Sequence, residues 1–294
     1  MKISRIGHVG LRVADLDRAV AHATDILGLR EVERTDGSAY LTCNERHHEL
    51  VLIGDTKPSC DHIALEVEST NDLEEASSAL AREGLTVLSE RPEEPGIAHA
   101  LRFVGPSGHV FELFAGMRRD QPAFYNTVGV RPRYFEHITI TAEKPAEMED
   151  FLTRVLGFRV SDRMGQTQMW LRCNTHHHTI AVVTGANGLH HYAWALDSWG
   201  TIAALGDHLR ANGTAFLWGP GRHGVGNNLF CYFYDSEGFI VECDTDMLRI
   251  EPEYAHVPRD WPDHYLSISQ WGAPPPEGFL AYSMPLTQRE ALHV

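Results

Sequence analysis

The sequence contains one short pattern twice: residues 43–48 read CNERHH, and residues 173–178 read CNTHHH. A second pair repeats at the same offset of 130 positions, with GHVFE at residues 108–112 and GFIVE at residues 238–242. Self-similarity at a fixed spacing is the signature of a duplicated structural unit. We therefore predict that the chain of 294 residues contains two homologous halves.

Two pairs of histidines extend this repeat at an offset of 129 positions. His8 matches His137, and His62 matches His191. Four matches at one near-constant offset are difficult to obtain by chance. These histidines are therefore expected at equivalent positions of the two halves.

The matches also define the expected domains. We place an N-terminal domain at residues 1–116 and a second domain at residues 133–246. A linker joins them at residues 117–132, and a tail rich in proline and aromatic residues follows at residues 247–294.

Each half divides again into two modules. Apolar residues recur at helical spacing in residues 14–28 and 70–83 of the first half. Three short strands are expected after each helix, for example at residues 214–218, 229–234 and 239–244. The predicted unit is β-α-β-β-β, repeated four times, which makes an α+β fold of two homologous halves.

The composition limits the kinds of partner. Apolar residues make up 43% of the chain and the formal net charge is −15, which is typical of a globular protein and unfavourable for binding nucleic acid or anionic lipid. The first residues lack the apolar core of a signal peptide, so we expect a cytoplasmic protein. Five cysteines without a C-x-x-C pair stand beside 18 histidines, so imidazole and carboxylate groups should hold any metal.

Two histidines and one glutamate recur at matched spacings in the two halves. The second half carries His137, His191 and Glu242, and the first half carries His8, His62 and Glu112. Two neutral imidazoles and one carboxylate on one face of a metal leave its opposite face open, as in non-haem Fe(II) oxygenases. The pattern therefore predicts an Fe(II) site, and Mn(II) accepts the same ligands.

The second half also contains GPGRHGV at residues 219–225 and NNLFCYFYD at residues 227–235. With the repeated modules and the two-histidine, one-glutamate sets, the chain resembles the type I extradiol (meta-cleaving) catechol dioxygenases of the vicinal oxygen chelate superfamily over residues 1–246. The resemblance implies insertion of both atoms of O2 into a catechol to give a muconic semialdehyde-type product. It further implies a role in aromatic hydrocarbon catabolism and a homo-oligomeric enzyme.

The resemblance implies a role for each residue of the site. Its metal ligands match His137, His191 and Glu242. Its other site residues match His178, which moves protons near the metal, His223 and Tyr232, which support the site, and Trp170, which lies near the substrate.

The role of His178 also follows from its chemistry. A catechol that binds a metal through both oxygens must lose a proton, and histidine is the side chain that titrates near neutral pH. His176 or His177 would take this role if the strand register shifted by one or two residues.

The two halves differ in the residues around their ligand sets. His223 corresponds to Glu93 in the first half and Tyr232 corresponds to Arg102, although His178 has a partner in His48. We therefore expect catalysis in the second half only. The ligand set of the first half is expected to be a metal-free remnant, with a second metal site as the alternative.

Trp218 bears on the substrate. Relatives that cleave carboxylated catechols use an arginine just before the Gly-Pro-Gly-Arg-His run, and this chain has Trp218 there. An indole cannot pair a carboxylate as a guanidinium does, so we expect an uncharged catechol, either unsubstituted or with alkyl, chloro or aryl groups. The alternative is that Trp218 only packs in the core.

The aromatic residues of the tail bear on access to the site. They either cover the site or form a subunit interface; they are Trp261, Tyr265, Trp271, Phe279 and Tyr282.

Other functions are compatible with this type of fold. A glyoxalase-type isomerase would use similar ligands on Zn²⁺ or Ni²⁺ without O2, and a binding protein of the bleomycin-sequestering type would need no metal. A 4-hydroxyphenylpyruvate-type dioxygenase would share the ligand types, but it fits the run at residues 219–225 less well. The combination of His178, His223 and Tyr232 favours the extradiol dioxygenase.

Overall fold

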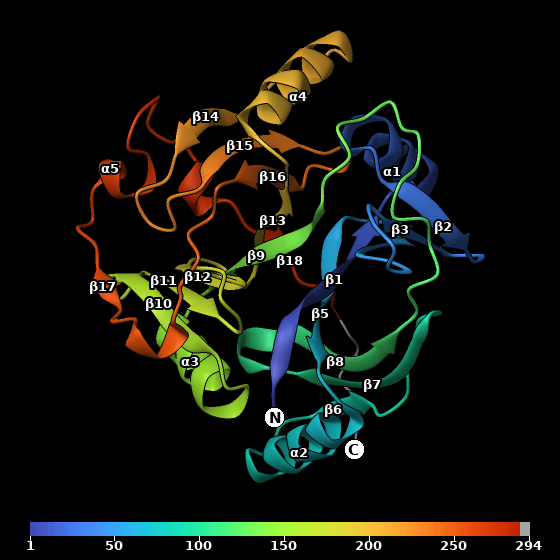
Figure 1. The fold of residues 1–294 in the computed structure, drawn as a ribbon. Coiled ribbons are helices and arrows are strands. Elements are labelled where there is room, and N and C mark those ends of the chain that lie inside the picture. Colours follow the sequence, from blue (N-terminus) through green and yellow to red (C-terminus); the bar gives the residue numbers. More distant parts are fainter. Residues whose placement is uncertain (289–294) are drawn as a thin grey trace.

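The computed structural model describes residues 1–288, which form two β-sheets with helices on their outer sides (Figure 1). The last six residues of the predicted tail lie outside the described residues. Within the described part, no helix combines the length and the apolar composition that crossing a membrane requires.

The first sheet has eight strands in the order β2-β3-β4-β1-β5-β8-β7-β6. Its strands are β1 (Ile3–Val13), β2 (Arg30–Arg34), β3 (Ser38–Thr42), β4 (Leu50–Gly54), β5 (Ser59–Val67), β6 (Val87–Ser89), β7 (Ile97–Val104) and β8 (Val110–Met117). The helices of this half are α1 (Leu16–His22), which continues as a π-helical turn (Ala23–Leu27), α2 (Thr70–Arg82) and a 3-10 turn (Pro106–Gly108).

The second sheet repeats this arrangement in the order β14-β15-β16-β13-β9-β12-β11-β10-β17. Its strands are β9 (Tyr134–Ala142), β10 (Arg159–Met164), β11 (Gln168–Arg172), β12 (Ile180–Thr184), β13 (Gly188–Ala195), β14 (Trp218–Arg222), β15 (Leu229–Tyr234) and β16 (Ile240–Thr245). The helices are α3 (Pro145–Asp150), again continued by a π-helical turn (Phe151–Val155), and α4 (Trp199–Ala211).

The tail returns to the second sheet. It contains two 3-10 turns (Glu253–Ala255 and Phe279–Ala281), β17 (Arg259–Asp260), α5 (Tyr265–Ile268) and β18 (Met284–Pro285). Strand β17 pairs with β10, and β18 pairs with β13, so the tail contacts both modules of the second half.

The predicted order of one strand, one helix and three strands, four times along the chain, is confirmed. One predicted strand is wrong. Residues 214–218 read TAFLW and are mostly apolar, but β14 begins only at Trp218, which pairs with Tyr232 of β15. The predicted helix at residues 14–28 begins at Leu16, where the Asp15 side chain accepts a hydrogen bond from the Arg18 amide, and ends at Gly28 with a positive φ of 74°.

The alternation of side chains along β9 separates core from site. Ile138 and Ile140 point to the apolar core, whereas His137 and Thr139 line a cavity on the opposite face. Helix α4 covers the core side with Ile202, Leu205 and Leu209. The cavity face is thus left for polar chemistry.

Candidate metal centre

The strand register brings three candidate ligands together. On the central strand β13, Ala193 pairs with His137 of β9 on one side and with Glu242 of β16 on the other. His191 lies two residues before Ala193, so its side chain points to the same face. Residues that are 105 positions apart in the sequence thus meet on one surface.

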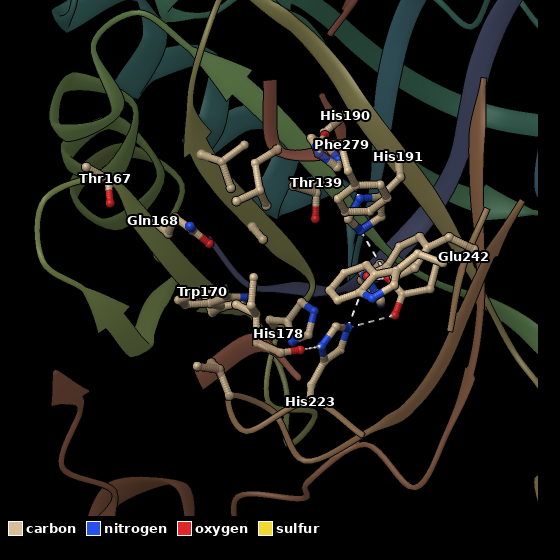
Figure 2. Close-up of a pocket in the computed structure, with 18 of the residues that line it drawn as sticks. Thr139, Thr167, Gln168, Trp170, His178, His190, His191, His223, Glu242 and Phe279 are labelled. Atoms are coloured by element: carbon tan, nitrogen blue, oxygen red, sulfur yellow. Dashed lines mark hydrogen bonds and ion pairs between the residues drawn. The ribbon is translucent and has the colours of Figure 1, made fainter. Parts of the chain in front are cut away.

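The geometry of these three side chains fits a metal ion. Figure 2 shows two of them, His191 and Glu242, on the cavity wall. The Glu242 Oε2 atom lies 3.1 Å from His137 Nε2 and 3.1 Å from His191 Nε2, and all three side chains are buried. Two ligands at right angles, each about 2.1 Å from a metal ion, are themselves about 3 Å apart. The spacing therefore suits a single ion held by all three groups.

His190 fixes the tautomer of His191. The Phe279 carbonyl can only accept, so His190 donates to it from Nε2 over 2.9 Å. Burial lowers the pKa of His190 to about 3, which keeps its Nδ1 unprotonated, and this atom accepts from His191 Nδ1 over 2.7 Å. The His191 Nε2 lone pair is therefore directed at Glu242 Oε2, and two acceptors that face each other require a cation between them.

A second relay fixes the tautomer of His178. The Asp162 carboxylate accepts from His177 Nε2 over 3.2 Å, and His177 Nδ1 lies 3.1 Å from His178 Nδ1. Burial lowers the pKa of both His177 and His178, so both rings are neutral. The proton between them belongs to His178 Nδ1, which leaves the His178 Nε2 lone pair free toward the cavity.

The tail completes this second relay. The Trp261 indole donates to Asp162 Oδ2 over 2.8 Å, and the Arg259 backbone amide donates to Asp162 Oδ1 over 2.8 Å. These two donors hold the carboxylate in the orientation in which it receives His177 Nε2.

His223 and Tyr232 lie on the other side of the ligand set. The Ile268 carbonyl of the tail accepts from His223 Nδ1, and His223 Nε2 lies 3.0 Å from the Tyr232 hydroxyl. Burial raises the pKa of Tyr232 well above its usual value, so the phenol keeps its proton. Tyr232 pairs in register with Glu242, which places its ring beside the carboxylate.

The candidate residues surround one cavity of about 160 Å³. His178 lines this cavity, whereas His176 and His177 do not. Trp170 and Trp218 also line it. The Trp218 side chain is nevertheless buried, with an exposed fraction of 5%. Its indole ring stacks on Tyr232 with an interplanar angle of 10° and donates a hydrogen bond to the Ala273 carbonyl. Trp218 is therefore part of both the core and the cavity wall.

Of the five aromatic residues predicted to act in the tail, Phe279 lines the cavity. It is joined there by Ile268 and Leu280, which the sequence did not single out. Tyr265 and Trp271 are both 45% exposed and lie away from the cavity lining.

The first half contains the predicted ligand set but in different surroundings. His8, His62 and Glu112 repeat the register of the second half, since Ala64 pairs with both His8 and Glu112. Glu93, the predicted counterpart of His223, accepts a hydrogen bond from Arg102 Nη1 over 2.9 Å, whereas Glu94 contacts His8 and His62. Glu94 lies 129 positions before His223, and Glu93 lies 130 positions before it. The residue at the offset of 129 thus faces the ligands.

Comparison with known proteins places the chain in a family. The model of the Glyoxalase/Bleomycin resistance protein/Dioxygenase superfamily matches residues 5–113 and 134–243. The chain belongs to this superfamily. The two matched segments correspond to the two halves that the sequence repeat predicts, and the resemblance to this group is confirmed.

Two curated relatives match at 28% identity. One is a manganese-dependent 2,3-dihydroxybiphenyl 1,2-dioxygenase from Geobacillus genomosp. 3, over 90% of this chain and 92% of the relative. The other is a metapyrocatechase from Pseudomonas sp. (strain CF600), over 80% of this chain and 84% of the relative.

Two solved structures share the fold. A Mn(II)-bound glyoxalase from Novosphingobium aromaticivorans is 28% identical and superposes with a TM-score of 0.88 over 99% of this chain and 96% of that one. Homoprotocatechuate 2,3-dioxygenase from Arthrobacter globiformis is 22% identical, with a TM-score of 0.91 over 98% of this chain and 93% of that one, which shows the same architecture.

The Asp162 relay leads to a prediction about a residue that the sequence did not identify. Asp162→Asn can donate to His177 Nε2 instead of accepting from it, which would move the proton of His178 from Nδ1 to Nε2. We expect kcat to fall about 10–100-fold while the metal content stays unchanged.

Steady-state oxygen uptake and metal analysis would check this prediction. The matched control is Glu33→Gln, since Glu33 Oε2 lies 3.2 Å from His47 Nε2 in the equivalent position of the first half. A kcat for Asp162→Asn equal to that of this control would contradict the relay.

Proposed function

We propose that the protein is an extradiol ring-cleaving dioxygenase that inserts both atoms of O2 into an uncharged catechol. The observation that carries the proposal is the convergence of three groups on one cavity: a His-His-Glu ligand set, a neutral histidine with a free Nε2, and a hydrogen-bonded tyrosine. The names of the two curated relatives, a 2,3-dihydroxybiphenyl 1,2-dioxygenase and a metapyrocatechase, support the same chemistry.

We assign Fe(II) to the ligands His137, His191 and Glu242, with Mn(II) as the alternative. The name of the manganese-dependent relative supports the second metal. When bound, the metal would lower the pKa of the catechol hydroxyl groups and bring catechol and O2 together at its open face.

The protein side chains would manage the protons of the reaction. His178 would accept a catechol proton at Nε2, because its Nδ1 proton is already committed to His177. Tyr232 would contact a substrate oxygen from the opposite side, and His223 would hold its hydroxyl in place. Trp170 and Trp218 would form walls against the aromatic ring.

The cavity supports a small, uncharged substrate. A cavity of about 150 Å³ can hold one benzene ring, and this one has a volume of about 160 Å³. Within residues 1–288, neither lysine nor arginine lines it. The volume therefore matches one aromatic ring, and each alkyl, chloro or aryl substituent on the catechol would need additional space. Cytoplasmic localisation and a homo-oligomeric state remain predictions of the same proposal.

One experiment tests the proposed function directly. Protein purified without oxygen, loaded with Fe(II) and mixed with a catechol should turn yellow when air is admitted, as ring opening gives a semialdehyde. An oxygen electrode should record one O2 consumed per catechol. Absence of oxygen uptake across a panel of catechols would reject the proposal.

A second candidate is a metal-dependent isomerase, because one solved relative carries the name glyoxalase. This activity would proceed without oxygen. Turnover of a glyoxalase substrate under anaerobic conditions, with no oxygen uptake on catechols, would favour it.

The position of Trp218 gives a prediction about specificity. Trp218→Arg places a guanidinium on the cavity wall, so activity on a carboxylated catechol should rise relative to catechol. We expect kcat/KM for the carboxylated substrate to increase about tenfold, which corresponds to one charge-assisted hydrogen bond of about 1.4 kcal/mol. Trp218→Phe is the control for loss of indole packing, and an unchanged substrate ranking in Trp218→Arg would contradict the prediction.

A further inference from the structure

The internal duplication allows the two ligand sets to be compared position by position. In the second half Glu242 pairs in register with Tyr232, and in the first half Glu112 pairs in register with Arg102. The two sheets are equivalent at this point, so a guanidinium stands where the other half has a phenol.

A carboxylate fills the centre of the ligand set in the first half. Glu94 Oε2 lies 2.8 Å from His8 Nε2 and 3.3 Å from His48 Nε2. Glu94 Oε1 lies 2.9 Å from His62 Nε2. The imidazole nitrogens that would bind a metal are therefore already in contact with an oxygen from the protein itself.

Arg102 supplies the positive charge of this cluster. Its Nη2 atom lies 2.6 Å from Glu112 Oε2, 3.0 Å from Glu94 Oε1 and 3.4 Å from His62 Nε2. Two buried carboxylates require a buried counter-charge, which a divalent ion supplies in a metal site. Here the guanidinium supplies it, and a metal ion at the same place would meet a fixed positive charge.

A free coordination position nevertheless remains. Glu112 Oε1 makes no hydrogen bond, and it lies 3.9 Å from His8 Nε2. The side chains of His8, His62, Glu94 and Glu112 are all at least nine-tenths buried, so the cluster is closed to solvent. Glu94 Oε2 also makes no hydrogen bond, so each of the two carboxylates keeps one oxygen that could bind an ion, while Arg102 Nη2 holds the other oxygen of each.

We propose that the first half contains a latent divalent-metal site, in which the Glu94–Arg102 ion pair takes the place of the ion and blocks the ligands His8, His62 and Glu112. Two side chains decide between an ion-pair cluster and a metal centre on the same backbone. Their replacement by the residues of the second half should open the site.

The test is the number of Mn(II) ions that remain bound per chain after desalting, measured by mass spectrometry of the metal. We expect one ion in the wild-type protein and two in the double variant Glu94→His/Arg102→Tyr, which copies the second half. Adding His8→Ala to the double variant should return the count to one. The difference between variants does not depend on catalysis, so failure of the proposed function leaves this test intact.

A second variant covers the case in which the double variant does not fold. Arg102→Met keeps the length of the side chain and removes its charge, so the two carboxylates should recruit Mn(II), and the thermal midpoint should rise when Mn(II) is added. Glu94→Gln keeps the Arg102–Glu112 pair and should still bind one ion. The proposal is overturned if the wild-type protein binds two ions and loses one on His8→Ala, or if both opened variants fold and bind only one.

Discussion

Glu242→Gln should lose the metal of the second half and reduce oxygen uptake on catechols to background. The carboxylate is the negatively charged member of the ligand set, and its Oε2 atom faces both His137 Nε2 and His191 Nε2. A neutral amide of the same size keeps the contact with Asn228 but not the charge. Loss of a group that merely supports a ligand weakens binding about 10–100-fold, so loss of the ligand should exceed about 100-fold. Titration of the metal-free protein with Mn(II) would measure this.

The duplication provides the control for this prediction. Glu112→Gln makes the same change at the equivalent position of the first half. We expect this variant to keep metal and activity, although it should lose about 3–5 kcal/mol of stability because Arg102 is left with fewer buried partners. Retention of the metal by Glu242→Gln, or its loss from Glu112→Gln, would show that the centre has been assigned to the wrong half.

His178→Gln should slow turnover strongly without removing the metal. General acid–base catalysis contributes about 10²–10⁴-fold, so we expect kcat to fall by that factor. KM should change far less, since the side chain lines the cavity but lies outside the ligand set. Initial rates of oxygen uptake, corrected for the metal content of each preparation, would give both constants.

The equivalent change in the first half again separates chemistry from stability. His48 is as buried as His178 and makes the same contact with its neighbouring histidine. His48→Gln should leave kcat unchanged. Equal rates in the two variants would argue against His178 as the group that moves protons.

The fold could be predicted almost completely from the sequence because the same sequence pattern occurs in both halves of the chain. The His8–His137 and His62–His191 matches fixed the modules, and strand periodicity placed each histidine on a defined face. The error at residues 214–218 has a simple cause. An apolar run indicates a strand only where a neighbouring strand provides hydrogen bonds, and β15 provides them from Leu217 onward.

The surroundings of the site could be predicted less well than its ligands. His190 acts on His191 through a shift of register between β9 and β13, and nothing in the sequence marks this irregularity. The offset of the repeat varies between 129 and 130, so the sequence alone could not distinguish Glu93 from Glu94. The partners of His190 and His223 are backbone carbonyls of Phe279 and Ile268, and backbone atoms carry no sequence signal.

The hydrogen bonds between the tail and His190, Asp162 and His223 have a thermodynamic consequence. If docking of the tail sets the lone pair of His191 toward the ion, then binding of the ion must favour docking of the tail by the same factor, since such coupling is reciprocal. Protease cleavage between residues 256 and 282 should therefore slow when metal is added. The amount of uncleaved protein would then measure how much of the metal centre is occupied, although the protease does not contact that centre.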